Sequence, residues 1–152
     1  MTYDITLVRV QPGLTLQETL DSFNDGFDPD ADLPLLRLTD TQRDEWDRIL
    51  DRVSRDIGAV DSEEYLYSLT LETVGPPRRV QLDYCGDTAH IEIVYRHSGP
   101  AALEMMELAY RIAHIAEDES GLTGRDFEVG QLTRTGDPAK AADRLSGISN
   151  WA

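Results

Sequence analysis

The sequence predicts an α+β domain with a mainly antiparallel sheet, in the order β-α-α-β-β-β-α-β, and with helices packed on one face of that sheet. Three observations predict this class. Several short runs alternate apolar and polar residues as half-buried strands do, and two longer segments carry apolar residues at helical spacing. The length of 152 residues fits one domain with its own core. We therefore expect residues 1–132 to form a single α+β domain.

The N-terminal part is expected to begin with a strand and a short helix. Residues 4–10 carry apolar side chains at both odd and even positions, which is typical of a strand buried on both faces. A helix is expected after Thr15, because Thr15 and Glu18 form a capping-box pattern. Residues 25–34 combine Gly, Pro and Asp, a composition that predicts an exposed loop.

The clearest predicted element is an amphipathic helix over residues 40–57. Thr39 and Gln42 form a capping box at its start, and Gly58 is a suitable residue to end it. Its apolar stripe consists of Trp46, Ile49, Leu50, Val53 and Ile57. This stripe is expected to pack on the sheet.

Three strand-like runs follow, at residues 65–74, 79–85 and 88–96. Gly86 and Asp87 form a tight turn between the last two runs, which favours an antiparallel meander. Apolar and polar residues alternate in each run, so one face of the sheet is expected to contact water.

A second long helix is predicted from Pro100, a residue favoured in the first turn, to the region of Gly121. Apolar side chains cover a wide stripe of this segment, which indicates heavy burial against the sheet. We expect Met106, Tyr110 and Ala113 to lie in the core.

The C-terminal part is predicted to contain one more strand and then a tail. Residues 125–132 fit a strand through Phe127 and Val129. The composition of residues 133–152 is rich in Gly, Asp, Pro, Ala and Lys, which predicts a mobile C-terminal tail.

Composition and charge exclude several classes of function. The net charge of -15 repels phosphate backbones and anionic lipids, so we expect no binding to nucleic acid or membranes. A single cysteine and the lack of a signal-like or membrane-spanning segment near the start favour a cytoplasmic protein. No glycine-rich phosphate-binding spacing is present, and we expect no cofactor.

The residues that could carry catalysis do not form a recognisable motif. Cys85 lies near His90 and His97 in sequence, but single cysteines in strands are mostly small buried hydrophobes. The three histidines, which include His114, lack the helical spacing that preorganises metal ligands. We therefore expect no catalytic residues, no metal site and no enzymatic activity.

Negative charge is concentrated in one part of the chain. Residues 21–64 contain 14 acidic residues and 5 arginines. Three alternate aspartates in this part resemble the start of a calcium loop, but Leu33 and Thr39 stand where that motif needs Gly and Glu. We instead expect these acidic side chains to attract a basic partner protein. The predicted partner-binding residues are Asp25, Asp28, Asp30, Asp32, Asp44 and Asp47.

A resemblance extends this hypothesis. The early strand with Tyr3 and Asp4, the acidic first half, the meander, the long helix and the segment from Glu119 to Gln131 resemble small acidic bacterial immunity proteins of polymorphic toxin systems. The resemblance implies a non-enzymatic protein that binds and blocks a basic toxin, for example a nuclease. Two alternatives stay open. One is a small-molecule-binding protein or small enzyme with a pocket between the sheet and the long helix, and the other is a structural or assembly subunit.

Overall fold

Seven antiparallel strands form one sheet in the computed structural model, which describes residues 2–25, 30, 35–74, 79–94 and 97–151. In spatial order the strands are β2, β3, β4, β5, β1, β6 and β7. Their bounds are β1 Thr2–Val8, β2 Val60–Glu64, β3 Leu69–Thr73, β4 Val80–Tyr84, β5 Thr88–Val94, β6 Thr123–Asp126 and β7 Gln131–Leu132. The helices are α1 Leu16–Asp25, α2 Asp40–Asp56, α3 Gly99–Ser120 and α4 Pro138–Trp151.

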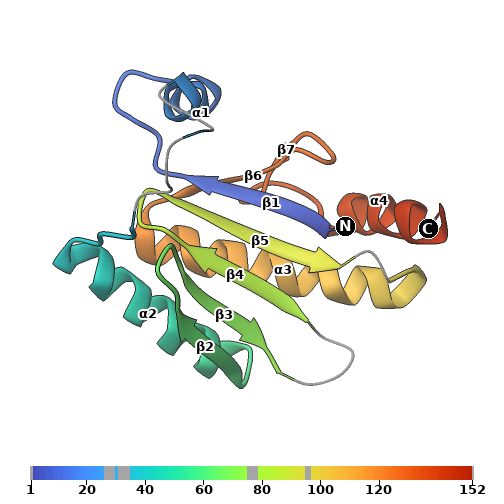
Figure 1. Cartoon of the computed structure of the whole chain (residues 1–152). Helices are drawn as coiled ribbons and strands as arrows, with labels where there is room; N and C mark the ends of the chain where they lie inside the picture. Colours follow the sequence, from blue (N-terminus) through green and yellow to red (C-terminus); the bar gives the residue numbers. More distant parts are fainter. Residues whose placement is uncertain (1, 26–29, 31–34, 75–78, 95–96, 152) are drawn as a thin grey trace.

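The predicted α+β class with a mainly antiparallel sheet is confirmed. Helices α2 and α3 cover the rear face of the sheet in Figure 1, and α4 packs beside α3. Helix α1 lies at the top of the same view, away from the other helices. The front face of the strands is covered by none of α2, α3 and α4, and we call it the open face.

Alternation along the strands produces the core. In β1 the side chains of Tyr3, Ile5 and Leu7 are buried, whereas that of Asp4 is exposed. The strands β4 and β5 alternate in the same way, so one face of the sheet packs on the helices and the other contacts water, as predicted for these runs. The expectation that the first strand is buried on both faces is wrong, because β1 exposes Asp4 on the other face.

Helix α2 forms for the reasons that the sequence indicates. The Thr39 side chain accepts a hydrogen bond from the Gln42 backbone, and the Gln42 side chain accepts one from the Thr39 backbone. The ring of Trp46, one of the buried residues of its stripe, stacks on Tyr84 with ring centroids 5.6 Å apart. The capping box fixes the start of α2, and the ring stacking holds α2 against β4.

Helix α3 is the central core helix. It starts with Pro100 in its first turn and ends at Gly121, which adopts a left-handed conformation with φ of 74°. Met106, Tyr110 and Ala113 are at most 1% exposed, as predicted.

Two parts of the sheet differ from the prediction. The run predicted over residues 65–74 starts as a turn, and β3 begins only at Leu69. The strand β2 was not predicted, because an exposed edge strand of acidic residues needs no apolar alternation. The strand predicted over residues 125–132 divides into β6 and β7, which pair with each other around a turn. Phe127 lies in that turn and is 46% exposed.

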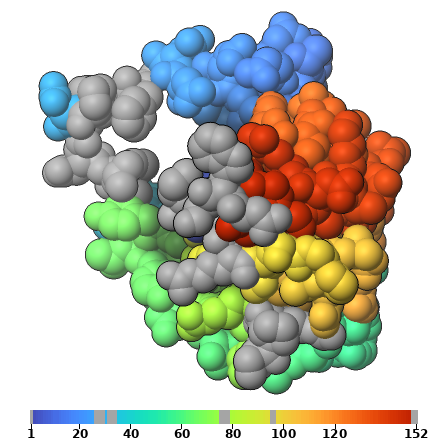
Figure 2. Space-filling view, turned by 90° about the vertical axis from the view of Figure 1, so that its right-hand side faces the viewer, coloured from blue at the N-terminus to red at the C-terminus, as the bar shows by residue number. Residues whose placement is uncertain are grey.

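The mobile tail predicted for residues 133–152 is wrong in the described part of the chain. Helix α4 packs on α3, and Figure 2 shows its red surface pressed between the yellow surface of α3 and the orange surface that precedes it. Ala141, Ala142 and Leu145 are buried in this contact. The small side chains of Ala141 and Ala142 allow the two helices to approach closely, and Leu145 adds apolar contact area. The polar composition of the rest of the segment made this apolar stripe difficult to recognise in the sequence. No helix in the described residues has the length and apolar character that crossing a membrane requires.

Candidate functional site

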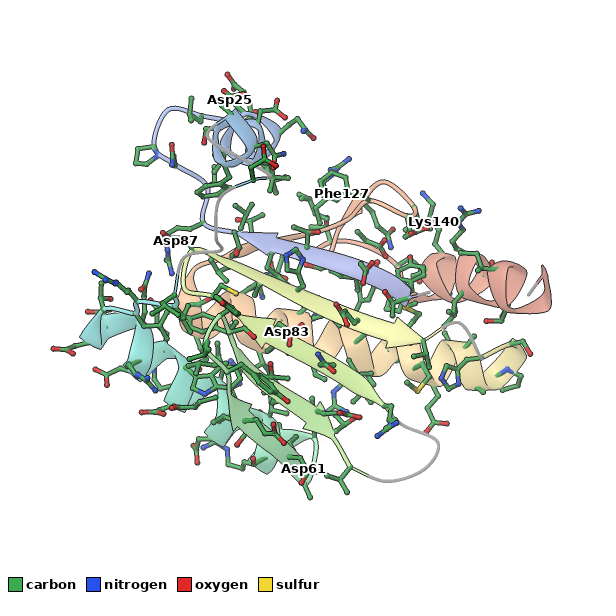
Figure 3. All side chains as sticks on the ribbon, viewed as in Figure 1. Asp25, Asp61, Asp83, Asp87, Phe127 and Lys140 are labelled. Carbon is green, nitrogen blue, oxygen red and sulfur yellow. The ribbon has the colours of Figure 1, made fainter. Side chains whose placement is uncertain are left out.

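Two of the four predicted acidic loop residues lie in the part of the chain that the structure describes. Asp25 is the last residue of α1 and is exposed at the top of Figure 3, and Asp30 is also exposed. Asp28 and Asp32 lie outside the described residues. Their proposed role in partner binding stays a prediction.

The other two predicted residues, Asp44 and Asp47, are exposed on α2. Helix α2 lies in the layer behind the sheet, at the lower left of Figure 1, whereas α1 lies at the top. Two arginines of α2 pair with α3, since Arg48 lies 3.2 Å from Glu119 and Arg52 lies 3.0 Å from Asp118. Of the described residues, Asp25 on α1 therefore lies on a different part of the surface from Asp44 and Asp47 on α2.

A row of acidic side chains crosses five strands of the open face. Strand register places Asp61 opposite Glu72, Glu72 opposite Gln81, Gln81 opposite Glu92, and Glu92 opposite Asp4. Each of these positions alternates with helix-facing residues on its strand, so the five side chains share the open face. Four of the five members of the row are carboxylates.

A second row lies beside the first. It aligns Glu63, Thr70, Asp83 and His90 on neighbouring strands. The Asp83 carboxylate accepts a hydrogen bond of 2.7 Å from the Thr70 hydroxyl and one of 3.0 Å from the Gln81 amide, and Figure 3 shows it near the centre of the sheet. We define the acidic sheet face as the six carboxylates of the two rows: Asp4, Asp61, Glu63, Glu72, Asp83 and Glu92.

Like charges are opposed directly on this face. The pairs Asp4 with Glu92 and Asp61 with Glu72 are cross-strand neighbours, an arrangement that destabilises a sheet. Partial burial raises the pKa of Glu92, the nearby Asp83 and Asp4 carboxylates raise it further, and His90 acts against them. The acidic sheet face therefore has unfavourable electrostatic energy in the free protein.

Among the residues that the structure describes, cations neutralise part of this charge. The Arg79 guanidinium lies 2.8 Å from the Glu72 carboxylate, and both side chains border a shallow hollow of about 180 Å³ on the open face. Gln81 and Glu92 border the same hollow. The arrangement is suited to receiving positive charge from outside.

Cys85 lies in an environment that disfavours a nucleophile. Its thiol is 3.5 Å from the Tyr67 carbonyl oxygen, to which it donates. Burial raises the pKa of the Cys85 thiol, and the Asp83 carboxylate raises it further. A raised pKa reduces the fraction of reactive thiolate at neutral pH.

The three histidines occupy separate environments. His90 is exposed on β5, the ring of His114 lies 2.7 Å from the Thr133 carbonyl oxygen, and the backbone N–H of His97 donates to Ser149 of α4. Among the described residues, no three His, Cys, Asp or Glu side chains are grouped as metal ligands would be.

Sequence reasoning missed the acidic sheet face as a unit. Polar alternation in the runs around Asp83 and Glu92 indicated a wet face, but strand order and register, which sequence patterns do not supply, align these residues with Asp4 and Asp61. No family model, no curated protein and no solved structure matches this chain.

Proposed function

We propose that this chain is a non-enzymatic inhibitor of the immunity-protein kind, which binds a basic protein and blocks it. The observation that carries the proposal is the direct opposition of Asp4 with Glu92 and of Asp61 with Glu72 on an open sheet face. The resemblance to immunity proteins makes a basic toxin, such as a nuclease, the expected partner.

The like-charge pairs are unfavourable in the free protein, and a basic partner would relieve their repulsion. Carboxylates placed opposite each other lower folding stability by a few tenths to about 1 kcal/mol per pair. A partner that brings lysines and arginines to the acidic sheet face removes this repulsion. The same carboxylates that lower folding stability would then strengthen binding. Long-range attraction from a net charge of -15 also accelerates the encounter with a basic protein.

The close contact between the sheet and α3 argues against the alternative of a small-molecule pocket at this place. Ile5, Leu7, Met106 and Ala109 fill it, and each has 0% exposure. A small-molecule site between the sheet and the long helix would require these side chains to move. The acidic sheet face needs no rearrangement to meet a partner.

The experiment compares two double variants that change the net charge equally. D4N/E92Q removes one opposed pair of the acidic sheet face, and D44N/D47N removes two exposed carboxylates of α2. The partner is first isolated from the native host by affinity capture and identified. Association and dissociation rates of the wild type and both variants are then measured at two salt concentrations.

We expect D4N/E92Q to slow association by roughly 10-fold at low salt and to flatten its salt dependence, while D44N/D47N has a smaller effect. A larger effect of D44N/D47N would move recognition to α2. Wild-type association rates for both variants would refute acidic docking. Co-expression tests the inhibitor role separately, because a partner whose activity is unchanged in the complex is not inhibited.

A further inference from the structure

Large apolar side chains are exposed at one end of the sheet. Leu35, Tyr65, Leu66 and Tyr67 are 57%, 53%, 68% and 47% exposed. The last three form the turn between β2 and β3, and Leu35 belongs to the segment that leads to α2. Exposed apolar side chains that lie together on a charged surface often mark a site of interaction with another molecule.

Backbone hydrogen bonds hold this apolar end in place. The Leu36 N–H donates to the Leu66 carbonyl oxygen at 2.8 Å, and the Tyr65 N–H donates to that of Ser68 at 2.8 Å. The segment around Leu36 is therefore attached to the β2–β3 turn. A surface that is ordered before binding loses little conformational entropy when a partner arrives.

A cleft of about 510 Å³ opens at this end, lined by Leu35, Leu36, Arg37, Tyr67 and Cys85. Its volume falls within the roughly 300–1,000 Å³ of pockets that hold ligands. Among the lining residues that the structure describes, Arg37 is the one ionised side chain at neutral pH, because burial and Asp83 raise the pKa of the Cys85 thiol. The cleft suits an apolar group.

The cleft lies next to the acidic sheet face. Cys85, directly after the end of β4, follows Asp83 by two positions, with the fully buried Tyr84 between them. On the neighbouring turn, the Tyr65 hydroxyl donates a hydrogen bond to the Glu63 carboxylate, which raises the pKa of Tyr65. Asp83 thus lies two positions from a lining residue of the apolar cleft, and Glu63 stands in the same cross-strand row as Asp83.

We infer that this cleft receives an apolar or aromatic side chain of the basic partner, flanked by lysines or arginines that pair with Glu63 and Asp83. The inference rests on the proposed function and specifies the chemistry of the partner. A second copy of this chain is a poor occupant, because it brings another charge of -15 to a carboxylate-rich border. Anchoring residues in desolvated pockets mainly set dissociation, whereas surrounding charges mainly set association.

The probes are short capped peptides that differ at one position. The first alternates arginine and valine and has tryptophan at its centre, the second has serine in place of tryptophan, and the third keeps tryptophan but replaces arginine by glutamate. Dissociation constants are measured by NMR titration of the labelled full chain. The protein variants are Leu66→Ser with Tyr67→Ser, and Phe127→Ser as the matched control at an exposed aromatic on another turn.

We expect the arginine peptide with tryptophan to bind the wild type at least roughly 10-fold more tightly than the serine peptide. The Leu66→Ser/Tyr67→Ser variant should lose this difference, and Phe127→Ser should keep it. Equal binding of the tryptophan and serine arginine peptides to the wild type would overturn the inference. The proposed function would stand in that case if D4N/E92Q weakened the binding of both peptides. Equal binding of the arginine and glutamate peptides would overturn the basic partner, and with it both proposals. Failure of all three peptides to bind at low salt would also overturn the inference.

Discussion

A buried carboxylate connects three elements of the core. Asp126 has 0% exposure, and one of its oxygens accepts hydrogen bonds from the Tyr3 hydroxyl at 2.7 Å and the Tyr110 hydroxyl at 2.6 Å. Its other oxygen accepts from the Glu128 backbone N–H at 3.1 Å. Gln131 of β7 donates to the Tyr110 hydroxyl at 2.7 Å. The network joins β1, α3 and the β6–β7 hairpin, so its loss should weaken the whole fold.

The substitutions Tyr3→Phe and Tyr110→Phe, made singly and together, remove the two hydroxyls that donate to Asp126. A hydrogen bond to a charged group contributes about 1.5–3 kcal/mol, so each single change should lower the free energy of unfolding by about 2 kcal/mol. The double change leaves the Asp126 carboxylate with the Glu128 N–H as its one remaining partner among those described. An undercompensated buried charge is expensive, so the double variant should lose more than the sum of the two single losses, by about 1 kcal/mol or more.

The assay is urea unfolding at pH 7, followed by far-UV circular dichroism, for the wild type and the three variants. The slope of the unfolding free energy against urea should not change, since the same core is exposed on unfolding. Single losses below about 0.5 kcal/mol that add without coupling would show that Asp126 does not depend on these hydroxyls. Such a result would refute the assignment of a shared buried carboxylate.

Three further predictions concern other parts of the fold. Burial and Asp126 raise the pKa of Tyr3 and Tyr110 above the usual value, so the unfolded state loses these protons first as the pH rises. The free energy of unfolding should therefore fall above about pH 10, by up to about 1.4 kcal/mol per pH unit for each tyrosine. Tyr3→Phe should make this fall less steep. Gly124→Ala places a Cβ 2.2 Å from the Thr133 hydroxyl oxygen and should cost about 1–3 kcal/mol in thermal unfolding, but less in a Thr133→Ala background. Leu145→Asp should cost about 3 kcal/mol or more in urea unfolding, whereas an unchanged midpoint would mean that α4 does not pack on α3.

The elements that the sequence predicted well are those whose signals are local. The capping box at Thr39 and Gln42 and the stripe around Ile49 lie within one helix, and the structure places them as expected. Helix α4 was missed because Gly147 interrupts its helical pattern and because the burial of Leu145 depends on its contact with α3. Tertiary packing overrides weak local propensity in such segments.

Two turns of the sheet also show that local signals are predictable from sequence and tertiary ones are not. The tight turn at Gly86 was predicted from its composition, and Gly86 has a positive φ of 87° that suits glycine. The turn at Tyr65 to Tyr67 was not, because its residues have strand-like side chains. The aromatic residues there are exposed, so the preference for β structure was overcome by the hairpin that joins β2 to β3.

The carboxylates of the acidic sheet face can be replaced without disturbing the core. The proposed function can therefore be tested with variants that keep the fold. The register that opposes Asp4 and Glu92 is set on the other face, where the neighbouring pairs Ile5 with Ile91 and Tyr3 with Ile93 are buried. A slip by one residue would turn these apolar side chains to water, so the core fixes the register whatever residues occupy the open face. A neutral or basic residue at position 92 would keep the same core and relieve the repulsion. D4N/E92Q should therefore fold at least as stably as the wild type, and any loss of binding in that variant reports on the surface alone.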